Sequence, residues 1–300
     1  MKNKTLILNL IGAIFLSFRV QAGVQTSGYC GPKDEQGNYG TNCQWSLNNG
    51  ILTISGNGSM ADFGPSDVNH SNGSESPWDQ FYREINTVNV EYGIENLGAR
   101  AFKSLENLQN INIPNSVEEI SIHALSYTSL NSIDIPNSVN AIGSWAFEGC
   151  TSLTSVKIPD SVVSLGDGIF YLDSSLTSVE LPAFIERIGM STFHTTESLQ
   201  SIVIPDGVTD IDSSAFYNTN AVIYCQDTAQ HVCRNLINSA TSGQNQLQVY
   251  SQQGEYYVLD GVKYKNLSNM QKGISVKRIY TIEEANKVSG DKNRVSIKYR

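Results

Sequence analysis

The sequence lacks an apolar stretch long enough to cross a bilayer. Its longest apolar run extends from about Leu6 to Phe18, whereas the hydrocarbon core of a membrane takes about 20 residues. The chain also lacks a glycine-rich phosphate loop, a G-x-S-x-G nucleophile turn and an H-E-x-x-H zinc helix. We therefore expect no transmembrane segment, no cofactor, no metal site and no catalytic residues, and we predict that the protein is not an enzyme.

Basic residues are scarce in most of the chain. Residues 1–260 hold ten Lys or Arg against 26 Asp or Glu, whereas residues 261–300 hold ten against three. A nucleic-acid-binding domain usually presents a basic face, so the acidic body argues against a nucleic-acid partner. The basic tail is instead predicted to contact an anionic envelope polymer or the acidic body itself.

The apolar run near the N-terminus has the layout of a secretory signal peptide. Lys2 and Lys4 precede it, and small residues follow at Val20 and Ala22. We expect cleavage near Ala22 and export of the mature chain, which would then be secreted, periplasmic or displayed on the cell surface.

The middle of the chain repeats itself with a fixed period. Five apolar runs end in an aliphatic residue followed by proline, at steps of 22 or 23 residues: Ile113-Pro114, Ile135-Pro136, Ile158-Pro159, Leu181-Pro182 and Ile204-Pro205. A second series keeps the same step: Ala101-Phe102, Ala124-Leu125, Ala146-Phe147, Ile169-Phe170, Thr192-Phe193 and Ala215-Phe216. Self-similarity at this period predicts a solenoid of stacked coils.

Within one unit, the pattern predicts a short strand followed by a turn. Leu153, Val156 and Ile158 have the L-x-x-L-x-L spacing that buries apolar side chains along a strand, and proline then ends the strand. Gly166 is predicted to permit a tight bend. The segment "DGIFYLD" that follows is predicted to form about one helical turn.

This pattern resembles the BspA-type leucine-rich repeat family. The segment "LNSIDIPNSVNAIGSWAFEGC", residues 130–150, matches the family motif nearly throughout, and Cys150 is the only residue that keeps its terminal cysteine. The resemblance covers residues 85–225. It implies an α+β but mostly β fold, a curved leucine-rich-repeat solenoid with short parallel strands.

Both ends of the solenoid differ from the repeats. "CQWSLNNGILTISGNGSM" predicts a hairpin about Asn48-Asn49-Gly50 and is similar to the capping module that often precedes BspA-type repeats. Residues 61–76 are predicted to form a solvated loop that buries nothing, before Trp78 and Phe81 return to the core. After the repeats, a strand and a capping helix are expected, and then a small β-rich appendage with a hairpin about Asp260-Gly261.

These features divide the chain into four parts. Residues 1–22 are the predicted signal peptide, 23–84 the N-terminal capping module, 85–243 the leucine-rich repeat solenoid with its C-terminal cap, and 244–300 the basic C-terminal module.

Cysteines in an exported chain favour disulfides over metal sites. Cys30 and Cys43 flank the N-terminal module, and Cys225 and Cys233 flank the exit from the repeats. We predict that each pair forms a disulfide. The alternative for the second pair is a zinc site with His231, but a fourth ligand is missing.

Three carboxylates in "IPDGVTDIDSSAF", Asp206, Asp210 and Asp212, raise the alternative of a calcium site. They occupy positions of a repeat turn that are expected to face solvent. We therefore predict no metal there.

The predicted binding surface is the concave strand face, where outward positions of successive strands form a ladder of small polar groups with opposite charges at its centre. The candidate residues are Asn110, Asn112, Ser132, Asp134, Ser155, Lys157, Ser178 and Glu180.

The resemblance implies adhesion, by binding of a protein or other macromolecular ligand. Two further functions are open: a structural envelope protein that has no dedicated ligand and is retained by its basic tail, and, less favoured, a carbohydrate-acting enzyme.

Overall fold

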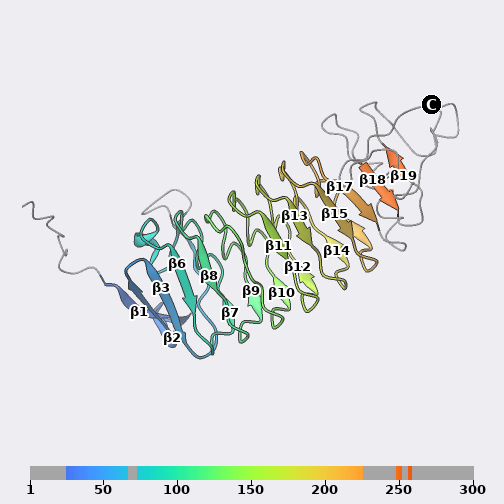
Figure 1. Ribbon diagram of the computed structural model, residues 1–300. Helices are drawn as coiled ribbons and strands as arrows, with labels where there is room; N and C mark the ends of the chain where they lie inside the picture. The colour runs from blue at the N-terminus through green and yellow to red at the C-terminus, as the bar shows by residue number, and fades with distance from the viewer. Residues whose placement is uncertain (1–24, 67–72, 226–247, 252–255, 259–300) are drawn as a thin grey trace, which may run out of the picture.

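The computed structural model describes residues 25–66, 73–225, 248–251 and 256–258. These residues form an elongated stack of coils in which short parallel strands of successive coils lie side by side (Figure 1). The predicted leucine-rich-repeat solenoid, mostly β, is confirmed. Helix is almost absent, since the described part of the chain contains only a three-residue 3-10 helix, η1 (Asp79–Phe81). The predicted signal peptide lies outside the described residues.

The N-terminal hairpin begins the first sheet. Strands β1 (Ser27–Lys33), β2 (Tyr39–Asn48) and β3 (Ile51–Gly56) pair in antiparallel fashion. Strand β3 then pairs in parallel with β6 (Thr87–Val90), and β6 with β8 (Asn110–Asn112). The predicted hairpin therefore covers the first coil by continuing its sheet, which satisfies an edge that would otherwise be open.

A second parallel sheet continues along the same side of the stack (Figure 1). Its strands are β11 (Ser155–Lys157), β13 (Ser178–Glu180), β15 (Ser201–Ile204), β17 (Val222–Cys225), β18 (Gln248–Ser251) and β19 (Tyr256–Val258). Only the last pair, β18 with β19, is antiparallel. The predicted capping helix and the hairpin about residues 260–261 lie outside the described residues.

Between the two sheets, the strand expected at Ser132 and Asp134 does not form, and the ladder is interrupted there. The coil that leads into this segment is one residue short. Only Ser129 separates Thr128 from Leu130, whereas Thr151 and Ser152 occupy the equivalent turn of the next coil. We attribute the loss of pairing to this shorter turn, because strand register depends on the length of the connection.

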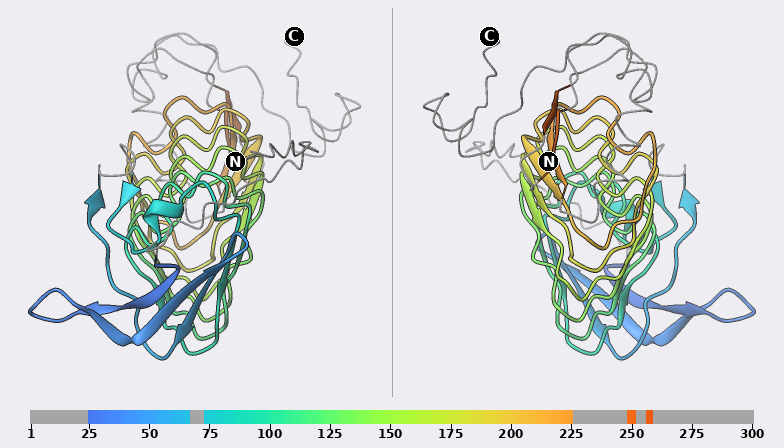
Figure 2. Two further views of the ribbon diagram at one scale, coloured as in Figure 1. Left: turned by 90° about the vertical axis from the view of Figure 1, so that its left-hand side faces the viewer. Right: turned by 90° about the vertical axis from the view of Figure 1, so that its right-hand side faces the viewer.

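Short two-residue strands line another side of the stack. They are β7 (Asn96–Leu97), β9 (Glu119–Ile120), β10 (Ala141–Ile142) and β12 (Ser164–Leu165), followed by the pair β14 (Arg187–Ile188) and β16 (Asp210–Ile211). A separate small hairpin joins β4 (Pro65–Ser66) to β5 (Gly73–Ser74). The end-on views show how the coils enclose a single interior (Figure 2).

The third side of each coil consists of turns rather than the predicted helical turn. Backbone N–H groups of one coil donate to carbonyls of the next, as from Phe102 to Ala124 O at 2.9 Å and from Phe147 to Ile169 O at 3.1 Å. Residues two positions from the core phenylalanine, such as Thr195 at φ 62° beyond Phe193, take left-handed conformations. These conformations cost about 1 kcal/mol each in a residue other than glycine, and the coil-to-coil hydrogen bonds hold them.

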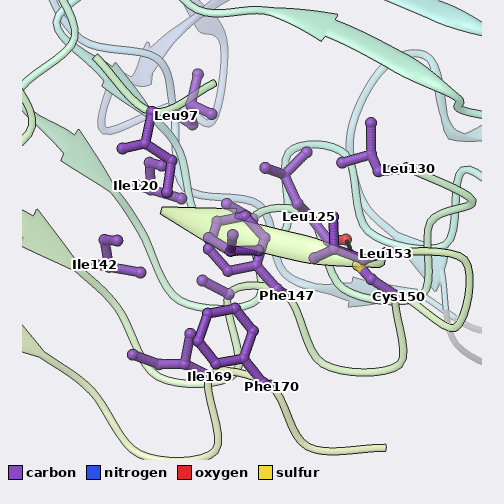
Figure 3. Packing of buried hydrophobic residues seen from close by; sticks show 14 of the residues in the cluster. Leu97, Ile120, Leu125, Leu130, Ile142, Phe147, Cys150, Leu153, Ile169 and Phe170 are labelled. Carbon is purple, nitrogen blue, oxygen red and sulfur yellow. Dashed lines mark hydrogen bonds between the residues drawn. The ribbon is translucent and has the colours of Figure 1, made fainter. Parts of the chain in front are cut away.

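The core is built from columns of identical positions. Phe147, Phe170, Phe193 and Phe216 are buried and stack with neighbouring ring centroids 5.1–5.7 Å apart. Figure 3 shows Phe147 above Phe170, with aliphatic side chains of the short strands beside them. Parallel rings follow from the repeat, since each coil places the same residue at the same position.

The column that ends the family motif is polar and buried. It contains Thr128, Cys150, Asp173, Thr196 and Thr219. Cys150 N donates to Asp173 Oδ1 at 2.7 Å, and Thr196 Oγ1 donates to Thr219 Oγ1 at 3.2 Å. The column is therefore a mixed hydrogen-bonded ladder, in which threonine or aspartate takes the place of the motif cysteine.

The N-terminal module has its own aromatic core. Trp78 and Phe81 are buried as predicted, and the Trp78 indole N–H donates to Ala101 O at 2.7 Å. The prediction that residues 61–76 bury nothing is wrong: Phe63 is buried against Trp78, with centroids 5.3 Å apart. A single phenylalanine in a polar segment carries no periodicity, so its burial could not be inferred from pattern.

Gly166 acts differently from the prediction. Its φ is not among the positive values that a tight bend would need. A Cβ at Gly166 would instead collide with the backbone of Ser144 in the preceding coil, and a Cβ at Gly143 would collide with that of Ile122. Glycine permits the close approach of two coils at these positions.

We expect Gly166→Ala to lower the free energy of unfolding by about 1–3 kcal/mol, because the added methyl group forces adjacent coils apart. Gly207→Ala is the matched control, since its Cβ would approach only carbonyl oxygens at 3.0 Å, and we expect a smaller loss. Urea unfolding of both variants measures the difference. Equal losses would contradict the close-approach interpretation.

Asp173 makes the interior sensitive to pH. Burial raises the pKa of its carboxyl well above the usual 3.8, and the charge of Glu148 adds to this rise. Above pH 3.8 the unfolded chain loses this proton while the folded chain keeps it, so stability falls as pH rises toward the folded-state pKa. Asp173→Asn keeps the acceptor for Cys150 N and cannot ionise.

We expect Asp173→Asn to be more stable than the wild type by at least about 1 kcal/mol at pH 7, and the difference to shrink toward pH 4. Urea unfolding of both proteins at the two pH values gives the comparison, in which other titrating groups cancel. A difference that stays constant across this range would show that Asp173 is ionised in the folded chain.

Candidate functional site

The candidate surface is the strand-ladder face, which we define as the outward positions of β6, β8, residues 131–135, β11, β13 and β15. All eight residues predicted on this face are exposed: Asn110, Asn112, Ser132, Asp134, Ser155, Lys157, Ser178 and Glu180. Side chains alternate between the two faces of a strand. In β11, Val156 therefore points into the core while Ser155 and Lys157 on either side of it point outward.

Strand register brings the charged residues of this face together. Lys157 lies directly opposite Glu180, and Ser155 opposite Ser178. The Lys157 Nζ atom is 3.0 Å from Glu180 Oε2, and both side chains are at least 70% exposed. An ion pair this exposed contributes about 0–1 kcal/mol to stability, so its charges remain available to a ligand.

At the N-terminal end of the face, the side chains are amides. Asn112 Nδ2 donates to Asn89 Oδ1 at 3.1 Å across β6 and β8. The structure brings the predicted residues together as two groups, because the unpaired segment with Ser132 and Asp134 separates β8 from β11. The face is thus an amide end and a charged end joined by an irregular coil.

One exposed aromatic residue near this face was missed by the sequence analysis. Phe184 lies on the turn from β13 to β14 and is 69% exposed. The same position holds only small residues in the other four coils: Ser116, Ser138, Ser161 and Gly207. That departure from the repeat was the available signal.

The turn side of the solenoid carries a second group of polar and aromatic residues. Glu148 accepts a hydrogen bond from Tyr127 OH at 2.8 Å, and its other oxygen lies 3.1 Å from His123 Nδ1. Burial acts to raise the pKa of Glu148, but the contacts with His123 and Tyr127 outweigh it and hold the pKa below its usual value. The carboxylate is therefore an acceptor that fixes its neighbours, and it is poorly suited to donate a proton near pH 7.

The predicted disulfide between Cys30 and Cys43 is present and joins β1 to β2. Closing a loop of this size stabilises a fold by about 3 kcal/mol. Cys150 is a free, buried thiol whose pKa is raised by burial, so it is unreactive. The pairing of Cys225 with Cys233 stays a prediction because Cys233, like His231 of the alternative zinc site, lies outside the described residues.

The carboxylates weighed as calcium ligands have protein partners. Asp210 Oδ2 is 3.2 Å from Arg187 Nε, and hydrogen bonds from Ser214 lower the pKa of Asp212. Across residues 25–66 and 73–225 and the two short strands beyond them, no three His, Cys, Asp or Glu residues gather as a metal site. Within the same part of the chain, no helix has the length and hydropathy needed to span a membrane.

Three comparisons place the chain among known proteins. The model of the family described as "BspA type Leucine rich repeat region" matches residues 95–223 in six copies. No curated protein matches the chain.

Several solved structures are similar to the chain. A leucine-rich repeat protein from Eubacterium ventriosum is 22% identical over 62% of this chain and 64% of its own, with a TM-score of 0.44. One from Bacteroides ovatus is 23% identical over 63% of this chain and 55% of its own, with a TM-score of 0.46. The T. pallidum leucine-rich repeat protein is 20% identical over 66% of this chain and 95% of its own, with a TM-score of 0.42.

The matched part of the chain spans less than two thirds of the E. ventriosum and B. ovatus proteins. The six matched copies coincide with the stacked coils, their phenylalanine column and their strand ladder. Residues 95–223 are thus a BspA-type leucine-rich repeat region.

Proposed function

We propose that the chain is an exported, adhesion-type protein that binds a protein or another macromolecular ligand through the strand-ladder face. The observation that carries the proposal is the exposed ladder itself, in which Lys157 and Glu180 lie in register on neighbouring strands with no buried partner. Leucine-rich repeat folds commonly serve as protein-interaction modules, and solenoids use extended strand surfaces for this purpose.

The size of the face predicts weak binding. Five strands and the unpaired segment 131–135, about 4.8 Å apart and each about 10–15 Å long, cover roughly 240–360 Å², whereas a standard interface buries about 800 Å² per partner. The strand residues also include none of the aromatic or arginine side chains that usually anchor an interface. The turns beside the strands must therefore contribute, and affinity is expected to depend on several contacts at once.

Phe184 supplies the missing anchor. It is a large apolar side chain, mostly exposed, on the turn that continues from Glu180. Its neighbour Ala183 holds the turn, because the Ala183 N–H donates to Asp160 Oδ1 at 2.9 Å. An aromatic ring on a fixed turn loses little conformational freedom on binding.

The disulfide between β1 and β2 supports export, since disulfides persist in oxidising compartments outside the cytoplasm. A second candidate function, a structural envelope protein retained by its tail, is supported by the excess of seven positive charges in residues 261–300. This second function predicts that the chain binds an anionic polymer through its tail, and that this binding does not depend on the strand-ladder face.

The double variant Lys157→Glu with Glu180→Lys tests the face. The exchange keeps an ion pair but reverses its polarity, so the melting temperature should stay within a few degrees while ligand capture changes. Capture of immobilised extracellular matrix proteins by the purified chain is the measurement. Unchanged capture by the folded variant would place the binding site elsewhere.

Phe184→Ser tests the anchor, because it installs the side chain found in the equivalent turn of three other coils. We expect capture to weaken by about tenfold or more, as for truncation of an interface hot spot, with unchanged stability. Tyr217→Ala removes an aromatic side chain that is 44% exposed on the turn side of the solenoid, against His194, and is the matched control. Equal effects of the two substitutions would contradict a role for Phe184.

A further inference from the structure

The N-terminal module contains a pocket that the strand-ladder face does not use. The residues that line it include three aromatic ones, Tyr29, Tyr39 and Trp45, of which Tyr39 and Trp45 lie on the same side of β2, and three that carry amides, Gln25, Asn38 and Gln80. Its volume is about 520 Å³, within the usual range of small-ligand sites. No lining residue is ionised at neutral pH.

The aromatic walls are fixed by contacts behind them. Trp45 packs edge-on against Trp78, with centroids 5.9 Å apart, and Tyr39 OH donates to Glu75 O at 3.0 Å. The disulfide between Cys30 and Cys43 joins the two strands that carry Tyr29 and Trp45. The pocket is therefore formed before a ligand arrives, which reduces the entropy lost on binding.

The floor of the pocket contains an unused hydrogen-bond donor. Trp45 is only 3% exposed, yet its indole N–H has no acceptor in the described part of the chain, in contrast to that of Trp78. Gly28 lies opposite Trp45 in the β1–β2 register. A Cβ at Gly28 would lie 3.0 Å from the Trp45 Nε1 atom, so the missing side chain opens a path to this donor.

The chemistry of the lining selects the ligand. The charges beside the lining are already engaged, Lys33 with Glu75 and Asp34 with Asn38, so a charged ligand would lose its hydration without gaining an unpaired counter-charge. A polyproline segment would offer carbonyl acceptors but no N–H groups, which would leave the amide oxygens of Gln25, Asn38 and Gln80 without donors. A neutral sugar offers hydroxyl groups that both donate and accept, and apolar C–H faces that pack on aromatic rings.

We propose that this pocket binds the end of a neutral oligosaccharide, with a sugar ring beside Tyr39 and a hydroxyl group accepting from the Trp45 indole N–H. The pocket is independent of the strand-ladder face, so the protein binds a glycan at its N-terminal end and a macromolecule along its strands.

The test is titration of the full chain with neutral tetrasaccharides of glucose, N-acetylglucosamine and mannose, followed by calorimetry and tryptophan fluorescence. At least one should bind saturably at one site. Trp45→Phe keeps a ring against Trp78 but removes the donor, and should weaken binding about five- to tenfold. Gly28→Val should abolish binding by filling the pocket floor, since Gln25, the other close side chain, can move.

Ser46→Val is the matched control. Ser46 is exposed and adjacent to Trp45 on β2, so its side chain points to the opposite side of the strand. It should leave saccharide binding unchanged, as should the Lys157 and Glu180 exchange. The proposal is overturned if no neutral saccharide binds, or if decaproline binds the pocket and the saccharides do not. It is also overturned if Gly28→Val binds saccharide as well as Ser46→Val does while both variants are folded.

Discussion

The constraint on which the structure depends is the fixed distance between adjacent coils. Backbone hydrogen bonds cross from coil to coil at the strands, at the short opposite strands and at the turns. Each coil is therefore held about 4.8 Å from the next. Phenylalanine rings can stack only because this distance is nearly the same in every coil, and Gly143 and Gly166 are needed where the backbones approach most closely.

The same constraint determines how residues are distributed. A position that faces inward does so in every coil, so one polar residue in an inward column must find its partner in a neighbouring coil. The Cys150 backbone N–H donates to Asp173 Oδ1 in this way, and Thr196 Oγ1 donates to Thr219 Oγ1. A position that faces solvent also does so in every coil, so the exposed side chains of neighbouring coils lie next to one another. Lys157 and Glu180 form an ion pair for this reason.

Periodicity made most of the fold predictable. The columns of Phe147 and Phe170, the alternation around Val156 and the disulfide between Cys30 and Cys43 could all be inferred from spacing and composition. Features that occur once could not. Phe63 is buried in a polar segment that has no counterpart in the repeats. Phe184 is exposed at a repeat position that holds serine or glycine in four other coils, and those small residues do not indicate how a phenylalanine there is placed. The missing residue before Leu130 was visible in the sequence, but its effect depends on the strand register in three dimensions.

These exceptions indicate where the solenoid acquires specific surfaces. A perfect repeat would present the same side chains at every coil and could distinguish ligands only by length. The interruption at Ser132 and Asp134 divides the strand-ladder face into chemically different ends, and Phe184 marks one coil among several. At the N-terminus, the hairpin that covers the first coil must use residues outside the repeat, and Gly28 opposite Trp45 opens a pocket there. Binding surfaces on this fold are therefore expected where the repeat is broken, because only there can a side chain be unlike its neighbours in the adjacent coils.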